Sequence, residues 1–125
     1  MRVKQAFLIL QAVALLGFGL AYLIVPLQMA ELSGMGLLTS AAVTDVRAYY
    51  GGLEIGLAVY LLLSLKSEAD RFNALRLLGI AYFAMFGARL AGIFIDGGEQ
   101  QFNYIALGLE GVSLVLAVFL MGRRG

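Results

Sequence analysis

Four long apolar runs dominate this sequence and constrain its fold more than any other feature. Each run is about 20 residues or slightly more, the length that an α-helix needs to cross the hydrocarbon core of a membrane. The runs are Ala6–Val25, Val46–Leu65, Phe72–Ile95 and Phe102–Met121. Lipid admits only helices and closed barrels, and these runs lack the alternating pattern of barrel strands. The sequence therefore predicts an all-α, four-helix transmembrane bundle.

The composition agrees with a protein of the bilayer. Of the 125 residues, 62% are hydrophobic and 14% are charged, whereas soluble domains average roughly 45–50% and about 25%. Four spans and their connections use up this length, so we expect a single domain over residues 1–125. The net charge is only +1 and the bases other than Arg89 stand at or near the ends of the runs, which argues against a nucleic-acid partner.

The sequence contains no Cys and no His. Their absence removes disulfides, thiolate and imidazole metal ligands, and the usual nucleophile–imidazole pairs. We therefore expect no metal site, no cofactor and no catalytic residue. Any chemistry would depend on carboxylates, Arg, Tyr or the backbone.

The connections differ in character. Pro26 closes the first run, and Thr44 with Asp45 supplies an N-cap for the second. The segment between them, Gln28–Thr44, is too apolar for an ordinary solvated loop, so we expect it to lie in the outer membrane interface and to cover that end of the bundle. Its apolar residues include Leu32, Met35, Leu37, Leu38 and Val43. The other two connections are short and polar, and they join antiparallel neighbours. They are Lys66–Arg71 and Asp96–Gln100.

The basic residues indicate the orientation of the chain, because Lys and Arg favour cytoplasmic segments. With four spans, both termini and the middle connection share one side. That side carries Arg2, Lys4, Lys66, Arg71, Arg76, Arg123 and Arg124. The opposite side carries Glu31, Asp45, Asp96 and Glu99, with Arg47 the one base nearby. We therefore expect a multi-pass protein with cytoplasmic N- and C-termini.

Three ionisable residues, Glu54, Arg89 and Glu110, fall well inside the predicted spans. A charge that faces lipid at this depth costs about 3 kcal/mol or more, so we expect all three to face the interior and to find partners. Counted from the nearest helix end, each lies roughly 9–12 Å deep in the outer half. This common depth predicts one contiguous network, which Arg47 would join from above.

Further polar residues lie near these charges by helical spacing. Tyr50 stands between Arg47 and Glu54, and Asn103 shares a helical face with Glu110 and Ser113. Asp96 follows Arg89 by about two turns, and Asp45 precedes the second run. The candidate ligand-binding or buried polar network is therefore Arg47, Tyr50, Glu54, Arg89 and Glu110. Asp45, Asp96 and Asn103 are secondary candidates.

Two interpretations of this cluster remain open. In one, a satisfied polar network fixes which helices pair and touches no ligand. In the other, the cluster forms the floor of a pocket that opens outward, where Arg47 and Arg89 hold an anionic head group and the carboxylates bind or exchange protons.

Other residues suit packing more than chemistry. Gly17 and Gly19 would let the first helix approach its neighbours closely. Two spans carry ridges of small residues, namely Ala48, Gly52 and Gly56, and Ala84, Ala88 and Gly92. Three tyrosines near the outer ends are expected to anchor the membrane interface, namely Tyr22, Tyr49 and Tyr104.

The sequence resembles a bacterial membrane family, domain of unknown function 4345, over nearly its whole length. The likeness is carried by a D-x-R-x-x-Y-G-G-like start to the second span, an Arg with an acidic-Gly turn in the third, and a Glu in the fourth. The residues are Asp45, Arg47, Tyr50, Gly51, Gly52, Arg89, Asp96, Gly97 and Glu110. The resemblance implies a bacterial plasma (inner) membrane protein and supplies no reaction.

Three functions compete. The first is a non-enzymatic module that binds a membrane lipid, an amphiphilic small molecule or a membrane protein partner, with a second copy of the chain as a further candidate. The second is a small proton-linked transporter in which Glu54 or Glu110 titrates. The third is a lipid-modifying enzyme, with a carboxylate as general acid or base. The cytoplasmic halves hold almost no polar residue except Gln11 and Ser64, which favours a one-sided pocket.

The second function has a known analogue that fits poorly. Small multidrug-resistance transporters share the length and the four spans, and their hallmark is a Glu in the first helix. The first run of this chain contains no acid.

Overall fold

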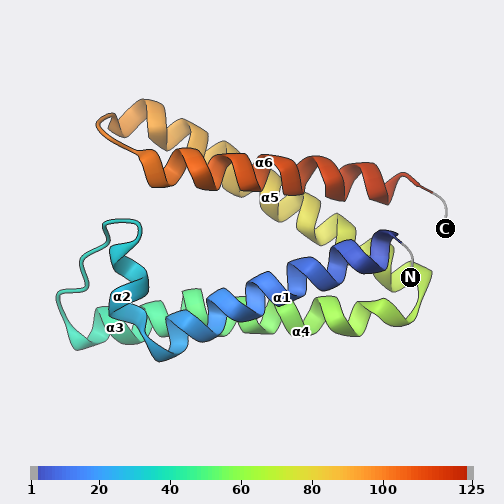
Figure 1. Ribbon diagram of the computed structural model, residues 1–125, viewed down its shortest axis with the longest axis horizontal. Helices are drawn as coiled ribbons and strands as arrows, with labels where there is room; N and C mark the ends of the chain where they lie inside the picture. The colour runs from blue at the N-terminus through green and yellow to red at the C-terminus, as the bar shows by residue number, and fades with distance from the viewer. Residues whose placement is uncertain (1–2, 124–125) are drawn as a thin grey trace. The chain divides into compact units, whose positions relative to one another are not determined.

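The computed structural model describes residues 3–123, nearly all of them in helices (Figure 1). Among these residues there is no strand, and four helical segments are long and apolar enough to cross a membrane. They are Val3–Ile24, Ser40–Lys66, Glu68–Asp96 and Gln101–Met121. The all-α prediction and the four span-length helices are therefore confirmed. Two bases that contributed to the predicted orientation, Arg2 and Arg124, lie outside the described residues.

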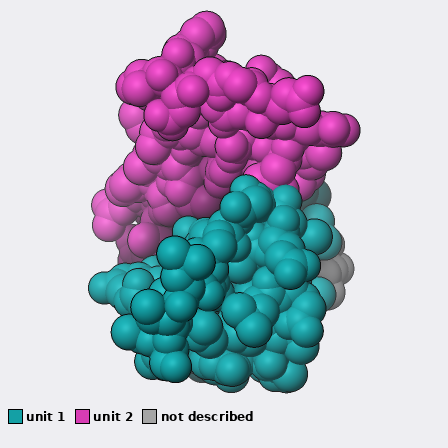
Figure 2. All heavy atoms as spheres, turned by 90° about the vertical axis from the view of Figure 1, so that its left-hand side faces the viewer, with its two compact units in different colours: residues 1–66 teal, residues 67–125 magenta. Residues whose placement is uncertain are grey.

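The chain divides into two compact units, Met1–Lys66 and Ser67–Gly125, which Figure 2 shows in different colours. Each unit contains one pair of long antiparallel helices, and we call these pairs the first and the second hairpin. They are described separately.

The first hairpin packs α1 (Val3–Ile24) against α4 (Leu53–Leu63) and the turn that precedes α4 (Figure 1). Gly19 and Gly51 make this approach close. A Cβ on Gly19 would lie 3.0 Å from the Gly51 carbonyl oxygen, and a Cβ on Gly51 would lie 3.1 Å from the backbone nitrogen of Leu23. Backbone atoms cannot move aside as a flexible side chain can, so both positions require glycine. Among residues 3–123, nothing lies within 4 Å of such a Cβ on Gly17, so of these two glycines it is Gly19 that serves the predicted close approach there.

The connection in the first hairpin contains two short helices, α2 (Pro26–Glu31) and α3 (Ser40–Val46). The predicted helix start after Thr44 and Asp45 is wrong, because both residues lie inside α3. The helix begins earlier because Thr39 provides an equivalent N-cap, and its hydroxyl oxygen accepts a hydrogen bond from the Ala42 N–H at 3.1 Å. Residues 40–42, Ser-Ala-Ala, then continue the helix readily.

The apolar side chains of this connection are only partly covered. Leu32 is 58% exposed and Leu38 is 93% exposed. Such exposure suits a segment that lies against lipid, but its position in the outer interface stays a prediction.

A single π-helical turn, η1 (Arg47–Gly52), joins α3 to α4. The N–H of Leu53 donates to the Ala48 carbonyl, five residues earlier, where an α-helix would use a residue four earlier. This wider turn shifts the helical phase of everything before it relative to everything after it. The α-helical spacing that placed Arg47, Tyr50 and Glu54 on one face therefore does not hold across η1.

The second hairpin consists of α5 (Glu68–Asp96) and α6 (Gln101–Met121), which lie side by side (Figure 1). Gly97 and Gly98 turn the chain between them with φ angles of 65° and 74°, a region that residues with a Cβ rarely adopt. Inside the hairpin, a Cβ on Gly111 would lie 3.1 Å from the Phe86 ring. An aromatic ring of α5 therefore packs on the bare backbone of α6.

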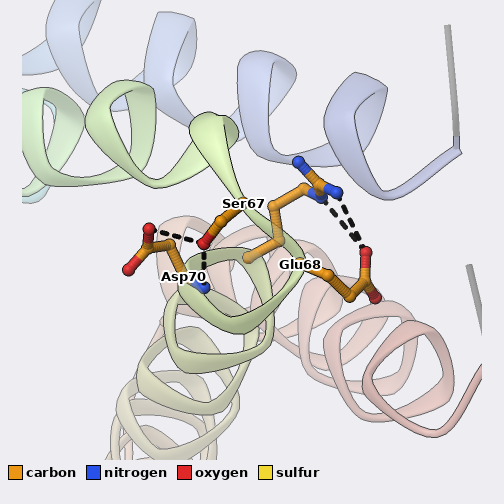
Figure 3. A network of polar contacts seen from close by, with 4 residues as sticks. Ser67, Glu68 and Asp70 are labelled. Carbon is orange, nitrogen blue, oxygen red and sulfur yellow. Dashed lines mark hydrogen bonds and ion pairs between the residues drawn. The ribbon is translucent and has the colours of Figure 1, made fainter.

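The opposite end of the second hairpin begins with a side-chain cap, shown in Figure 3. The Ser67 hydroxyl accepts a hydrogen bond from the Asp70 N–H at 3.1 Å and donates one to the Asp70 carboxylate at 2.6 Å. Next to it, Arg71 pairs with Glu68 at 3.0 Å. Only Ser67 separates α5 from the short 3₁₀ turn η2 (Ser64–Lys66), so the Lys66–Arg71 connection is shorter than predicted.

Candidate functional site

A chain of hydrogen bonds runs from the α5–α6 turn to a buried acid in the second hairpin. Arg89 of α5 donates its Nε–H to Oε1 of Glu110 and an Nη1–H to Oδ1 of Asn103, the latter at 2.7 Å. The Asn103 amide donates to Gln100 Oε1 at 2.8 Å, and the Gln100 amide donates to the Gly97 carbonyl at 2.8 Å. The guanidinium is thus held in a fixed orientation between two helices.

Helical spacing explains why these residues meet. Asn103 and Glu110 lie about two turns apart on α6 and therefore on the same face. The guanidinium presents its donors in a planar fork, which can reach a carboxylate and an amide oxygen at once. Glu110 is 5% exposed, and a charge buried that deeply needs such a partner.

A pocket of about 410 Å³ adjoins this network within the second hairpin. Its polar lining comes from Arg89, Asp96, Gln100 and Asn103, and its apolar lining comes from Met85, Ala88 and Gly92. Its volume lies in the range of small-molecule sites, roughly 300–1,000 Å³. Of the polar lining residues, Asp96 is exposed, and among residues 3–123 it has no hydrogen-bond or ion-pair partner. The pocket therefore combines a fixed guanidinium with an unpaired carboxylate.

In the first hairpin, Arg47 has a different partner from the one predicted. Its Nη1–H donates to the backbone carbonyl of Leu23, in the last turn of α1, where carbonyls lack helical donors. Arg47 thereby caps the C-terminus of α1, where a positive charge is also favourable. Within the part of the chain that the structure describes, no ion pair joins Arg47 to Glu54.

Glu54 interacts with one of two stacked tyrosines of the first hairpin. The Tyr22 and Tyr50 rings stack with centroids 5.1 Å apart, and Tyr22 lies near enough to Glu54 to interact electrostatically with it. Tyr22 is 9% exposed, so it is a packing residue of the first hairpin and not the exposed anchor that its position predicted. Tyr49 and Tyr104, at 65% and 56%, have the exposure that an interfacial anchor needs.

Within residues 3–123, two carboxylate oxygens are buried without a hydrogen-bond partner, Oε2 of Glu54 and Oε2 of Glu110. Burial of an unpaired polar atom is costly, so each such atom calls for an explanation such as a water, an ion or a proton. In Glu110 the other oxygen is paired with Arg89. The two hairpins therefore each hold one unsatisfied acidic oxygen.

The predicted site residues thus fall into two sets. The structure brings Arg89, Asn103 and Glu110 together, with Asp96 on the adjoining pocket. It places Arg47, Tyr50 and Glu54 in the other unit, and Asp45 is exposed there on α3.

The predicted network that joins the two sets stays a prediction. The depth that was predicted for Glu54 changes, because it was counted from a helix start at Val46, about two turns before Glu54. The observed helix starts at Ser40, about four turns before Glu54.

Sequence reasoning missed Gln100, and it gave Tyr22 the role of an interfacial anchor without predicting its contact with Tyr50. Gln100 links the turn to Asn103, and a signal for it existed, since the two are three residues apart at the start of a helix. Tyr22 carried no comparable signal, because its contact with Tyr50 depends on how α1 packs. Among the described residues, no group of three or more His, Cys, Asp or Glu side chains could hold a metal ion.

Comparison with known proteins agrees with the resemblance noted above. A protein-family model described as Domain of unknown function (DUF4345) matches residues 3–121. No curated protein matches the chain, and no solved structure matches it.

Proposed function

We propose a binding function for this chain, which belongs to the family described as Domain of unknown function (DUF4345). Its ligand is a lipid or another amphiphilic small molecule whose polar head enters the pocket beside Arg89. The observation that carries the proposal is the pocket itself, which has a volume of about 410 Å³ and the Arg89 guanidinium on its wall. The proposal assigns no catalytic residue.

The Arg89–Glu110 pair supports a binding role because it holds the Arg89 guanidinium in place without using all of the guanidinium N–H donors. Arg89 donates its Nε–H to Glu110 and one Nη1–H to Asn103, whereas a guanidinium has five N–H donors. The remaining hydrogens have no partner among residues 3–123, and the Arg89 side chain is 26% exposed. An oxygen-rich head group would satisfy them.

The membrane setting is part of the proposal. Four helices long and apolar enough to cross a membrane, together with the basic bias of the N-terminus, the Lys66–Arg71 segment and the C-terminus, favour a bacterial plasma membrane protein with cytoplasmic termini. The pocket would then open toward the outer leaflet. Because the chain has no natural Cys, Ser67→Cys offers a single labelling site. Labelling of this cysteine by an impermeant maleimide from outside intact cells would contradict the orientation.

The binding function can be tested by thermal unfolding of the purified protein in detergent. Added bacterial polar lipid should raise the Tm of the wild type, because a ligand that binds the folded state stabilises it. The double variant Arg89→Gln/Glu110→Gln should lose this lipid-dependent shift while it keeps its helical circular dichroism. Arg76→Gln, an exposed Arg of α5 away from the pocket, is the matched control and should keep the shift. An equal shift in all three proteins would refute the proposal.

A proton-linked transporter is the second candidate, and one observation favours it. Among residues 3–123 the buried Oε2 atoms of Glu54 and Glu110 have no hydrogen-bond partner, and a proton on Glu54, which has no ion pair there, would remove the cost of an unpaired charge. In proteoliposomes that contain a pH-sensitive dye, substrate addition should then move protons across the membrane. Glu54→Gln and Glu110→Gln should each abolish this movement, and unchanged proton movement in both variants would exclude the mechanism.

A further inference from the structure

The pocket of the second hairpin has two charged walls of opposite sign. Arg89 and Asp96 both line it, and they lie about two turns, or roughly 10 Å, apart along α5. Gly92 stands between them, and a Cβ on Gly92 would lie 3.5 Å from Oδ2 of Asp96. The Asp96 carboxylate therefore folds back along α5 toward the pocket, over a residue that offers no side chain of its own.

The charges of this region do not suit a purely anionic ligand. The positive charge of Arg89 is already matched by Glu110, so Asp96 leaves the pocket with an excess of one negative charge. An anion would gain hydrogen bonds from Arg89 but would be repelled by Asp96. A cation would be attracted to Asp96 but would leave the remaining Arg89 donors unused.

From this geometry we propose that the pocket selects a zwitterionic head group, with a phosphate against Arg89 and a primary ammonium against Asp96. The inference rests on the proposed function and narrows its ligand to a phosphoethanolamine-type lipid. Phosphate accepts from guanidinium in the same way as a carboxylate does. A primary ammonium has three N–H donors, which the free Asp96 carboxylate can accept.

The lining also distinguishes a primary ammonium from a quaternary one. Quaternary ammonium groups cannot donate hydrogen bonds, and proteins usually recognise them with the faces of aromatic rings. Of the residues that the structure describes, none that lines this pocket is aromatic. A choline head group would therefore lose its hydrogen bond to Asp96 and gain no aromatic cage in return.

Exposed apolar residues next to Asp96 in the sequence argue for a lipid as the source of the head group. Phe94 and Ile95 directly precede Asp96 on α5 and are 81% and 79% exposed. An acyl chain could lie along these side chains while the head group occupies the pocket. A free phosphoethanolamine molecule has no acyl chain that could contact that surface.

The test is a titration of the full chain in detergent with short-chain lipids that share one tail and differ in head group. The probes are dihexanoyl phosphatidylethanolamine, phosphatidylglycerol and phosphatidylcholine, with dodecylammonium and O-phosphoethanolamine as single-feature controls. The wild type should bind the phosphatidylethanolamine about ten-fold more tightly than the other two lipids, the scale of one lost charge-assisted hydrogen bond.

Asp96→Asn should remove this preference by weakening phosphatidylethanolamine binding and strengthening phosphatidylglycerol binding. The matched control is Glu99→Gln, an exposed acid of the same turn that does not line the pocket, and it should keep the wild-type preference. Neither substitution touches a buried charge, so both variants should fold.

The possible failures can be told apart. Equal binding of phosphatidylethanolamine and phosphatidylglycerol by the wild type would overturn the zwitterion inference and leave the proposed binding function intact. Binding of dodecylammonium as tight as that of phosphatidylethanolamine would overturn the role of Arg89. Binding of O-phosphoethanolamine as tight as that of the lipid would overturn the lipid source. Binding of none of the lipids would refute both the inference and the proposed function.

Discussion

Each hairpin has a glutamate in its second long helix, Glu54 in the first hairpin and Glu110 in the second. Each hairpin also has an arginine that donates a hydrogen bond, but the acceptors differ. In the second hairpin the arginine pairs with the glutamate, as Arg89 does with Glu110. In the first hairpin Arg47 donates to a helix-terminal carbonyl instead, and Glu54 lies beside Tyr22 without a guanidinium partner among residues 3–66. The same two residue types therefore produce a charge pair in one hairpin and a helix cap in the other.

Backbone geometry accounts for the difference. The second hairpin is regular α-helix, so a residue of α5 opposes residues of α6 that lie about two turns apart. In the first hairpin, η1 (Arg47–Gly52) interrupts the α-helix where Gly51 meets Gly19. Arg47 is the first residue of this wide turn and Glu54 follows the turn, so they do not share a face. The comparison teaches that one wide turn can redirect a charged side chain.

Loss of the charge pair should have the largest effect. Arg89→Gln should destabilise the protein by about 3–5 kcal/mol, because it leaves the Glu110 carboxylate buried without its counter-charge. The double variant Arg89→Gln/Glu110→Gln should recover most of this loss. Chemical denaturation in detergent, followed by circular dichroism, measures both. If the two variants were equally destabilised, the pair would not be the cause.

Arg89→Gln can also test whether Glu54 of the first hairpin interacts with Arg89. If Glu54 belongs to one network with Arg89, as its depth predicted, Arg89→Gln/Glu54→Gln should also be more stable than Arg89→Gln alone. If Glu110 is the sole partner, Glu54→Gln should add only its own small effect to that of Arg89→Gln. Strictly additive losses would therefore leave each hairpin with its own acid.

Close packing in the first hairpin should have the next largest effect. Gly51→Ala should cost about 1–3 kcal/mol, because the new Cβ would press on backbone atoms of α1. Gly17→Ala is the matched control in the same hairpin, because nothing lies within 4 Å of its Cβ, and it should be neutral or slightly stabilising. A cost as large at Gly17 as at Gly51 would contradict the packing account.

Removal of the helix cap should have a smaller effect. Arg47→Gln should cost about 0.5–1.5 kcal/mol, since it weakens one exposed hydrogen bond to the Leu23 carbonyl. Hydrogen exchange should rise at the last turn of α1 and at α2 while α6 stays protected. Equal exchange changes in both hairpins would show that Arg47 does more than cap α1.

Neutralisation of the unpaired acid should have the smallest effect. Glu54→Gln should change stability by about 1 kcal/mol or less, because no ion pair is lost within its hairpin. Glu110→Gln should be far more destabilising, since it leaves Arg89 without a counter-charge. Similar losses for the two substitutions would mean that Glu54 has a counter-charge of its own.

These comparisons also show what could be predicted from the sequence. The four span-length helices were predictable because each apolar run is long, and Asn103 could be placed with Glu110 because α6 keeps a regular period. The start of the second span was not predictable, because Thr39 and Thr44 are both good capping residues and no local signal separates them. The π turn was missed because it forms where two glycine backbones from distant parts of the chain meet.

The pocket was only partly predictable. Arg89 stood out because an arginine inside an apolar run needs a partner, and Asp96 stood out by its spacing from Arg89. Their joint role in one pocket depends on the fold of the Gly97–Gly98 turn and on the way Asp96 lies over Gly92. Neither feature leaves a periodic pattern in the sequence.

The most direct test of the account is to locate a bound lipid on the chain. A phosphatidylethanolamine with a photoreactive group close to its head can be incorporated into nanodiscs with the wild-type protein and cross-linked by light. Peptide mass spectrometry should place the main adducts within residues 85–103, around the pocket, and Arg89→Gln/Glu110→Gln should abolish them. Adducts spread evenly over the exposed apolar faces of all four long helices, and unchanged in the double variant, would contradict a specific site.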